Sequence, residues 1–462
     1  MRALAAGLLI ACVVASASGQ ASDKGAGELL DRWLAAQGGL ERLKAVRGYD
    51  YRETIRRGPG SRTVEIHVVQ TSNGRFRYET AYPWGGTLVQ ASDGIVCWQG
   101  NDRLGYGLIP NSAVPPLYLE EDLLTVLLVD RVYPKHRLLG DGEAQGRRCK
   151  VAEMTGRDGV GERFYFDVET GRCLRIERPR NGHPGEWNWT EYSDFRTVDG
   201  LVLPFTTAID RGDDKITRTR SDLVINPRLD TATFMISTAR FRELRAIEDI
   251  LARNLAEAGG DAIGRIHSRV TRAHVETSNQ SGKDRETISQ KEPDYILKVS
   301  ETPGMGTKWT GFDGTVGWST SEVEGFHLLK APEVAAMRNY GKLSDEGHLA
   351  DRWPLRKMVG RRQVNGRATH AVILSTFQFQ GGTFYFDDEN GRLLRMTSIF
   401  GDSDGHFEAT QDFSDFRRMD GVEKPFVITQ TDPTGKSVET IESIENNVPL
   451  DNSIFRPRKG DW

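Results

Sequence analysis

Short runs in which hydrophobic and polar residues alternate fill most of the chain. Residues 63–68 read Thr-Val-Glu-Ile-His-Val and residues 76–79 read Phe-Arg-Tyr-Glu. A period of two is typical of an antiparallel strand with one buried face and one face in water. The strands predicted later in the first half are Cys149–Met154, Arg163–Asp167, Cys173–Glu177, Trp187–Tyr192, Leu201–Ile209 and Lys215–Val224. The pattern therefore predicts a mainly antiparallel β protein.

Helical spacing of apolar residues occurs at two distant places, residues 29–43 and residues 247–263. Each stretch is interrupted by a pair of glycines, Gly38-Gly39 in the first and Gly259-Gly260 in the second. Paired glycines suit a helix C-terminus that is followed by a second short helix. No phosphate-binding glycine motif follows a strand at either place, so we interpret the glycines as structural.

A third helix is predicted at residues 117–129, where the sequence is apolar nearly all round. It follows Pro115-Pro116, which suits the first positions of a helix. A helix of this kind is either buried or faces an apolar ligand. The corresponding stretch of the second half, near residues 332–340, is shorter and more polar.

The same motifs occur twice along the chain. Phe-Tyr-Phe-Asp stands at 164–167 and again at 384–387, 220 residues later. Ser-Asp-Phe, Asp-Gly and Pro-Phe follow at 193, 199 and 204, and recur at 414, 420 and 425. An internal repeat of this length indicates a tandem duplication. We expect a first copy at residues 20–237 and a second copy at residues 238–462.

Composition agrees with two globular domains. The chain has 462 residues, 27% of them charged and 9% aromatic, which is enough for each copy to bury a core. The formal net charge is −4, and runs of like charge are short. This balance argues against a nucleic-acid partner.

The N-terminus predicts export. Arg2 precedes an apolar stretch, residues 3–14, and small residues at 15–19 provide cleavage sites. We expect a signal peptide at residues 1–19 and a periplasmic location. Cys12 stands in a lipobox-like context but inside the apolar run, so we do not expect lipid anchoring there.

Three cysteines would remain after cleavage: Cys97, Cys149 and Cys173. An odd number in an exported protein permits at most one disulfide. Packed or half-exposed thiols are the other interpretation, and the sequence leaves their redox state open.

The motif order resembles that of the LolA-like superfamily, which includes periplasmic lipoprotein carriers, outer-membrane lipoprotein-sorting proteins and mycobacterial lipid-binding lipoproteins. The residues that carry the resemblance in the first copy are Gly146-Arg147, Phe164–Asp167, Gly171–Arg175, Ser193–Phe195, Asp199-Gly200 and Pro204-Phe205. The resemblance implies an unclosed β-barrel in which helices plug an apolar cavity that accepts acyl chains. The expected fold class is thus α+β, mainly antiparallel β, with two tandem unclosed barrels of about 9–11 strands each and covering helices.

Large apolar side chains on these elements are the candidates for a cavity wall. Phe164 and Phe166 share one face of a strand, as Phe384 and Phe386 do in the second copy. Each candidate is either a ligand contact or ordinary core. The candidates are Leu117, Leu123, Leu124, Leu127, Phe164, Phe166, Trp98, Trp187, Trp189, Phe384, Phe386 and Trp318.

The sequence offers little support for catalysis. The nine histidines form no zinc-binding motif, and no nucleophile elbow is present. Asp93 and Asp313 are matched between the copies, as are Asp167 and Asp387, and their positions beside turns favour backbone hydrogen bonding. We therefore expect neither an enzyme nor a cofactor or metal.

Our primary hypothesis is an exported carrier that holds a lipid, an acyl chain or a lipoprotein, with peripheral contact to a membrane. An envelope protein that docks or senses a protein partner is the alternative. The first copy, with its more apolar helix, is expected to be the better lipid site.

Overall fold

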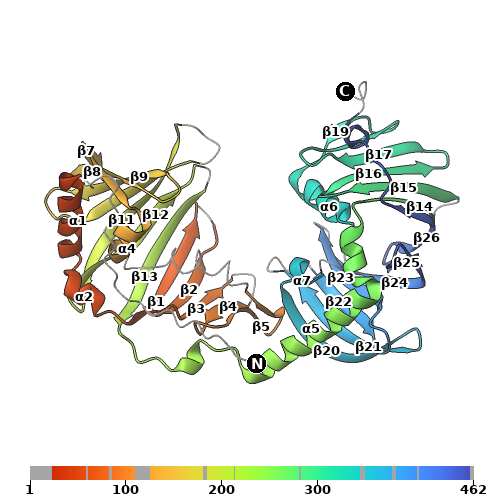
Figure 1. Ribbon diagram of the computed structural model, residues 1–462, viewed down its shortest axis with the longest axis horizontal. Coiled ribbons are helices and arrows are strands. Elements are labelled where there is room, and N and C mark those ends of the chain that lie inside the picture. The colour runs from red at the N-terminus through yellow and green to blue at the C-terminus, as the bar shows by residue number, and fades with distance from the viewer. Residues whose placement is uncertain are drawn as a thin grey trace. The chain divides into compact units, whose positions relative to one another are not determined.

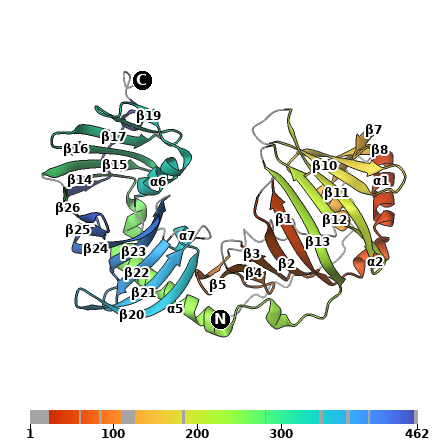
Figure 2. The same cartoon turned by 180° about the vertical axis from the view of Figure 1, so that it is seen from behind.

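The computed structural model describes residues 23–58, 61–82, 86–109, 125–180, 185–212, 214–279, 282–343, 349–376, 381–402 and 405–457. The chain divides into two compact units (Figures 1 and 2). The first unit comprises Met1–Ile95 and Pro110–Phe234, and the second comprises Val96–Ile109 and Met235–Trp462. The predicted signal peptide lies outside the described residues.

The first unit is an open antiparallel sheet with helices over one face. Its helices are α1 (Lys24–Ala36), α2 (Leu40–Lys44) and α4 (Thr125–Val132). Its strands are β1 (Gly48–Arg57), β2 (Val64–Thr71), β3 (Phe76–Ala81), β4 (Thr87–Ser92), β7 (Lys135–Ala144), β8 (Arg147–Thr155), β9 (Gly161–Asp167), β10 (Cys173–Pro179), β11 (Trp187–Val198), β12 (Leu201–Asp210) and β13 (Lys215–Ile225). Strand pairing follows the order β7-β8-β9-β10-β11-β12-β13-β1-β2-β3-β4.

The second unit repeats this order. Its helices are α5 (Thr238–Ala258), α6 (Ala331–Gly341) and α7 (Leu349–Arg352). Its strands are β14 (Ser268–Thr277), β15 (Lys283–Lys291), β16 (Tyr295–Thr302), β17 (Gly306–Phe312), β18 (Gly317–Ser321), β19 (His327–Leu328), β20 (Leu355–Val364), β21 (Arg367–Ser375), β22 (Gly381–Asp387), β23 (Leu393–Asp402), β24 (Gly405–Met419), β25 (Val422–Asp432) and β26 (Gly435–Asn446). The strands pair in the order β20 to β26 and then β14 to β19. The expected fold class, two open antiparallel half-barrels with covering helices, is therefore confirmed.

A hairpin from the first sequence repeat belongs to the second unit. It consists of β5 (Cys97–Asn101) and β6 (Gly105–Leu108), and β6 pairs with β20 through Tyr106 and Arg356. Lys357 Nζ donates a hydrogen bond to the carbonyl of Asp102 at 2.6 Å, and Ser375 Oγ donates one to the carbonyl of Leu104 at 3.0 Å. The hairpin thus adds strands to the β20 edge of the second sheet.

The glycine pairs predicted as helix punctuation meet the repeated Asp-Gly turns. Gly38 follows α1 with φ of +119°, and an added Cβ would lie 2.6 Å from the carbonyl oxygen of Gly200. Gly259 follows α5 with φ of +134°, and its Cβ would lie 2.7 Å from the carbonyl oxygen of Gly421. Both the backbone conformation and the close approach require glycine. The repeated motifs therefore contact each other in the same way in each unit.

Candidate functional site

One face of the first sheet carries an aromatic wall beneath the helices, and we call this face the inner face. Phe164 and Phe166 of β9 are 0% and 1% exposed. The Trp33 ring of α1 lies 6.2 Å from the Phe164 ring and 5.7 Å from the Phe166 ring, measured between centroids. Tyr133, which follows α4, meets Phe164 edge-on at 5.4 Å. These rings form one continuous apolar surface between sheet and helices.

The second unit has the corresponding wall. Phe384 and Phe386 are 2% and 0% exposed, and Trp353 meets Phe384 edge-on at 5.8 Å. The wall packs against a buried aliphatic cluster that comprises Ile247, Ile250, Leu251, Leu349, Val372 and Leu374. In this unit the predicted pair therefore lies in an aliphatic core under α5.

Part of the predicted mid-chain helix is α4. Within it, Val126 and Val129 are buried and Leu127 is half-buried. The candidates Leu117, Leu123 and Leu124 lie outside the described residues. The described helix continues three residues beyond the predicted end, to Val132.

The two matched tryptophans lie in different surroundings. Trp98 is on β5, in the hairpin that belongs to the second unit, and its ring centroid lies 6.0 Å from that of Tyr106. Trp318 is 1% exposed, and its Nε1 donates a hydrogen bond to the Phe455 carbonyl at 2.7 Å. Neither belongs to the aromatic wall of the first unit.

Trp187 and Trp189 lie on the opposite face of the first sheet, which we call the outer face. Thr190 pairs with Ile176, which itself pairs with Phe164, so the neighbouring Trp189 points the other way. The Arg163 guanidinium lies 4.1 Å from the Trp187 ring centroid. The structure therefore does not bring these tryptophans together with Phe164 and Phe166.

The inner face becomes polar on β13 and β1, which the sequence did not reveal. The Glu53 side chain is 0% exposed, and those of Arg218 and Arg220 are 17% and 10% exposed. Glu53 carboxylate oxygens lie 3.6 Å from Arg218 Nη1 and 3.4 Å from Arg220 Nε. Arg220 also donates a hydrogen bond to the Pro204 carbonyl at 3.1 Å and lies over the Tyr51 ring at 5.4 Å. We call Glu53, Arg218 and Arg220 the buried ion cluster.

Strand pairing connects this cluster to the aromatic wall. Cross-strand partners share a face, and the partners run across the sheet as Phe164, Ile176, Thr190, Ile209 and Ile216. Arg218 and Arg220 follow Ile216 at alternate positions of β13 and so lie on this same face. The inner face thus has an apolar part on β9 and β10 and a charged part on β13 and β1.

The second unit holds different residues at these positions. Ala273 pairs with Ile441 where Glu53 pairs with Arg220, and Val275 pairs with Glu439 where Ile55 pairs with Arg218. Nearby on the same face of the second sheet, Lys298 Nζ lies 2.8 Å from Glu286 Oε1. Burial and, after it, repulsion from Glu286 raise the pKa of Glu439, with Lys298 opposing them. Comparing the two repeats at their offset of 220 to 221 residues would have exposed these charge changes.

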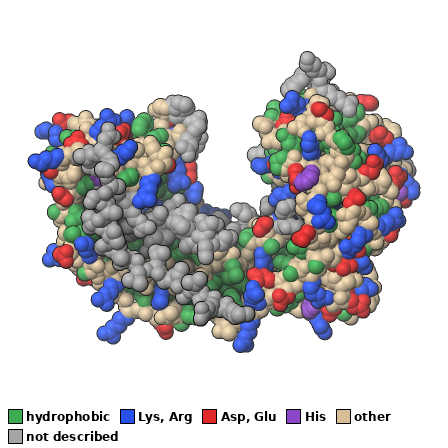
Figure 3. Space-filling view, viewed as in Figure 1, with side chains coloured by type: hydrophobic (Ala, Val, Ile, Leu, Met, Phe, Trp, Pro, Cys, Tyr) green, Lys and Arg blue, Asp and Glu red, His purple; other side chains and the backbone are tan. Residues whose placement is uncertain are grey.

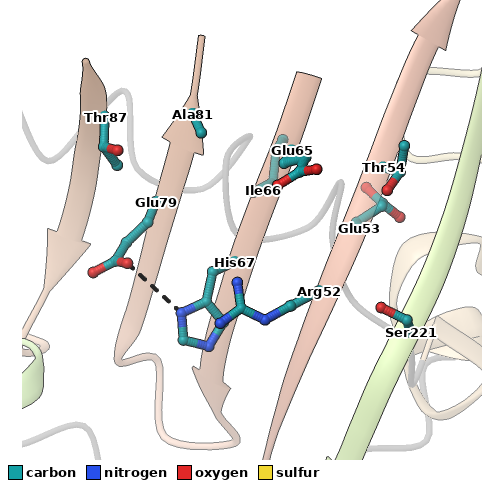
Figure 4. A pocket seen from close by; sticks show the side chains of 10 residues that line it. All are labelled: Arg52, Glu53, Thr54, Glu65, Ile66, His67, Glu79, Ala81, Thr87 and Ser221. Atoms are coloured by element: carbon teal, nitrogen blue, oxygen red, sulfur yellow. Dashed lines mark ion pairs between the residues drawn. The ribbon is translucent and has the colours of Figure 1, made fainter. Parts of the chain in front are cut away.

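A polar pocket of about 240 Å³ lies on the outer face of β1 to β4 (Figure 4). His67 Nε2 lies 2.7 Å from Asp50 Oδ1, and His67 Nδ1 lies 3.7 Å from Glu79 Oε2. Burial raises the pKa of Glu79, but Arg77 and His67 outweigh it, so the net shift is downward. This charged lining does not suit an acyl chain.

The matched aspartates serve turns. Asp167 accepts hydrogen bonds from the backbone N–H groups of Glu169 and Thr170, at 2.8 and 3.2 Å, and pairs with Arg147. Asp387 repeats this arrangement in the second unit. Asp93 and Asp313 accept bonds from the backbone two residues on, at 2.8 and 3.0 Å.

The described residues contain no group of three or more metal-ligating side chains placed to hold an ion. None of their helices is long and apolar enough to cross a bilayer. Cys97, Cys149 and Cys173 are buried free thiols, and burial raises the pKa of Cys149 and Cys173. Basic and acidic side chains are interspersed over the described surface in the view of Figure 3.

No protein-family model matches the sequence, and no curated protein sequence matches it either. Among solved structures, a LolA superfamily protein from Nitrosomonas europaea is 14% identical, with 46% of this chain and 97% of that chain covered at a TM-score of 0.33. A DUF1329 family protein from Desulfovibrio piger is 14% identical, with 46% and 97% covered at a TM-score of 0.34. The MucA/MucB complex structure from Pseudomonas aeruginosa is 11% identical, with 92% of this chain and 100% of that chain covered at a TM-score of 0.18. The first of these structures is described as a LolA superfamily protein, the group that the sequence motifs resemble.

Proposed function

We propose that the protein is an exported carrier that holds an acyl chain or similar apolar ligand on the inner face of its first unit, without a cofactor and without catalysis. The observation that carries this proposal is the aromatic wall of Phe164 and Phe166 with α1 and α4 laid over it. A sheet face covered by separate helices can admit an apolar chain between its layers. The peripheral membrane contact expected from the sequence belongs to this proposal, as the place where a ligand is taken up and released.

Area burial supplies the affinity in this proposal. Each Å² of apolar surface removed from water contributes roughly 25 cal/mol, without directional contacts. Such binding tolerates variation in chain length and permits release at a membrane. In the first unit the rings of both Trp33 and Tyr133 meet the wall, whereas in the second Trp353 meets it, and this larger aromatic surface makes the first the better candidate.

The test is ligand retention and uptake by the full chain. Gentle purification followed by native mass spectrometry and lipid extraction is expected to release a bound lipid. A dansyl-labelled fatty acid is expected to bind, and Leu127→Asn in α4 is expected to weaken it by about tenfold, because a half-buried leucine contributes on the order of 1.5 kcal/mol.

A matched control lies on the outer face of the same unit. Trp189→Ala removes a larger apolar side chain there and is expected to leave fatty-acid uptake unchanged. If the purified protein contains no bound lipid and takes up no fatty-acid probe, the carrier proposal is wrong.

A second candidate function is the docking of an envelope protein on the outer face of the first unit. Half-buried Trp187 and Trp189, stacked with Arg163 and Arg175 at 4.1 and 5.7 Å, favour it. The second unit has Glu408 and Thr410 at the corresponding positions, so the fold does not require the tryptophans. A stoichiometric protein that co-purifies with the wild type and is lost in Trp187→Ala would favour this candidate over the carrier.

A further inference from the structure

The buried ion cluster is costly for the first unit to hold. Moving charged groups out of water is unfavourable, and their mutual attraction only partly offsets this. Glu53 is 1% exposed as a whole residue, so its carboxylate has little access to water. A cluster of this kind indicates either a structural need or a function.

The second unit shows that the fold has no structural need for it. At the positions of Glu53 and Arg220 the same pair of strands carries Ala273 and Ile441, which are 0% and 9% exposed. These two apolar residues pack with Phe426 in a hydrophobic cluster. Because the scaffold is complete with an alanine and an isoleucine there, the ion cluster of the first unit is retained for another reason.

The surroundings of the two arginines suit an anionic group. Tyr192 and Thr207 are cross-strand partners on β11 and β12, and Thr207 is in turn the partner of Arg218. Burial raises the pKa of Tyr192 to about 12, so its hydroxyl remains a hydrogen-bond donor at neutral pH. Guanidinium groups bind carboxylate and phosphate oxygens through paired hydrogen bonds.

The distance from the wall to the arginines fits an amphipathic molecule. Phe164 on β9 and Arg218 on β13 are separated by four strand spacings, about 19 Å at ~4.8 Å each. An extended fatty-acyl chain has this length scale. A ligand lying along the inner face would therefore reach the arginines with one end while its tail covers the wall.

We infer that Arg218 and Arg220 form the subsite for the anionic headgroup, a carboxylate or a phosphate monoester, of an amphiphile whose apolar chain lies on Phe164 and Phe166. This inference rests on the proposed carrier function and specifies its ligand. The second unit, with Glu286, Glu439 and Lys298 on its inner face, does not select an anion.

The experiment compares ligands that differ only in headgroup charge. Dansyl-undecanoic acid and its methyl ester are titrated into the full chain, and monododecyl phosphate, dodecanol and inorganic phosphate compete with them. The wild type is expected to bind the acid about tenfold more tightly than the ester, since charge-assisted hydrogen bonds are the stronger kind. Monododecyl phosphate is expected to displace the acid, and inorganic phosphate alone is not.

The informative variant transplants residues from the second unit. Glu53→Ala combined with Arg220→Ile installs the apolar pair that the scaffold already accepts there, and Arg218→Met removes the remaining cation of the cluster. Replacing buried ionic groups together by apolar residues is often neutral for folding. This triple variant is expected to bind acid and ester equally, with ester affinity unchanged. Arg218→Lys keeps a cation and is expected to retain a preference for the acid, and Arg163→Met on the outer face is expected to change neither.

The outcomes separate the inference from the function on which it rests. If the wild type binds ester and acid equally, or the triple variant keeps its preference for the acid, the headgroup subsite is wrong while the carrier function stands. If neither probe binds, the carrier function itself fails. If inorganic phosphate displaces the probe as effectively as monododecyl phosphate does, the arginines bind a free anion and the lipid headgroup assignment is overturned.

Discussion

The two units agree in their turns and differ in the lining of their sheets. Gly38 approaches the Gly200 carbonyl as Gly259 approaches that of Gly421. Arg147 pairs with Asp167 as Arg367 pairs with Asp387. On the inner faces, by contrast, Glu53 and Arg220 stand where the other unit has Ala273 and Ile441.

This difference separates what folding requires from what function uses. Contacts present in both units close turns and seat helices, so they belong to the scaffold. Residues present in one unit alone are free of that requirement, and a costly residue among them calls for a functional explanation. In a duplicated chain, each unit thus serves as the reference against which the residues of the other unit can be compared.

The largest effect is expected where the units are most alike. Gly38→Val and Gly259→Val place a Cβ within 2.6 and 2.7 Å of a carbonyl oxygen at positive φ. Each is expected to destabilise the unit that carries it by about 3 kcal/mol, because backbone strain and a steric clash add. Urea unfolding followed by tryptophan fluorescence measures this, with Gly27→Ala in α1 as the harmless control. An effect in one unit alone would show that the shared contact is not equivalent.

The paired aspartates are expected to come next. Burial raises the pKa of Asp167 and of Asp387, but the paired arginine and two backbone N–H groups outweigh it, so both values are lowered. A carboxyl group whose pKa is lower in the folded than in the unfolded protein stabilises the fold at pH values above its ordinary pKa. This stabilisation is lost as the pH falls through the pKa of the folded state. Asp167→Asn and Asp387→Asn should each cost about 2 kcal/mol at pH 7, with the deficit shrinking below about pH 4.

Thermal melting of these two variants between pH 3 and pH 7 provides the measurement. A deficit that stays constant over this range would show that the ionised carboxylates contribute nothing. Glu169→Gln, at the exposed partner of Arg147, is the matched control and is expected to change stability little.

A gain in stability is expected at one position where the units differ. Glu439 stands where the first unit has Arg218, and burial raises its pKa, which means that the charged form is disfavoured in the folded state. A raised carboxyl pKa reduces stability as the pH rises above the ordinary value near 4.5. Glu439→Gln is therefore expected to stabilise the second unit by about 1 kcal/mol at pH 7 and to have no effect well below pH 4. A loss of stability at pH 7 would show that Lys298 more than compensates the charge.

The smallest effect is expected on the outer face. Trp189→Ala in the first unit should cost no more than about 1 kcal/mol, since Trp189 is half-buried and contacts Arg175 through a cation–π interaction. Fatty-acid uptake should be unchanged in a probe titration. Loss of uptake would place the ligand on the outer face and reverse the assignment of the two faces.

Much of the fold follows from local patterns. Alternation located strands such as Arg163–Asp167, which is β9 apart from its first two residues, and the paired glycines located the ends of α1 and α5. These signals are local, because strand alternation and helix ends depend on neighbouring residues. The assignment of faces across strands is not local. A register shift between Cys173 and Arg175 decides that Trp189 lies on the other face of the sheet from Phe164, and no periodicity within one strand reveals this shift.

The charged part of the site was unpredictable for a similar reason. Glu53 and Arg220 are separated by more than half of the first copy in sequence and meet only because β1 pairs with β13. The alternation of apolar and polar residues alone would predict that Glu53 lies on the solvent-exposed face of its strand. The pairing of β6 with β20 also depends on contacts between distant segments, and Gly105 and Gly107 allow it because an added Cβ would meet the backbone of Arg356 or Pro354.

The hairpin of β5 and β6 makes the chain cross between its units three times, near residues 95, 109 and 234. Expressing the second sequence repeat alone would therefore remove β5 and β6 from the β20 edge of the second unit. The backbone N–H and C=O groups at this edge would then lack the strand that pairs with them. The transfer runs in one direction, because the second unit keeps its own β18 and β19 and also holds β5 and β6. The smallest independent module of the second half is therefore residues 235–462 together with a segment encoded in the first.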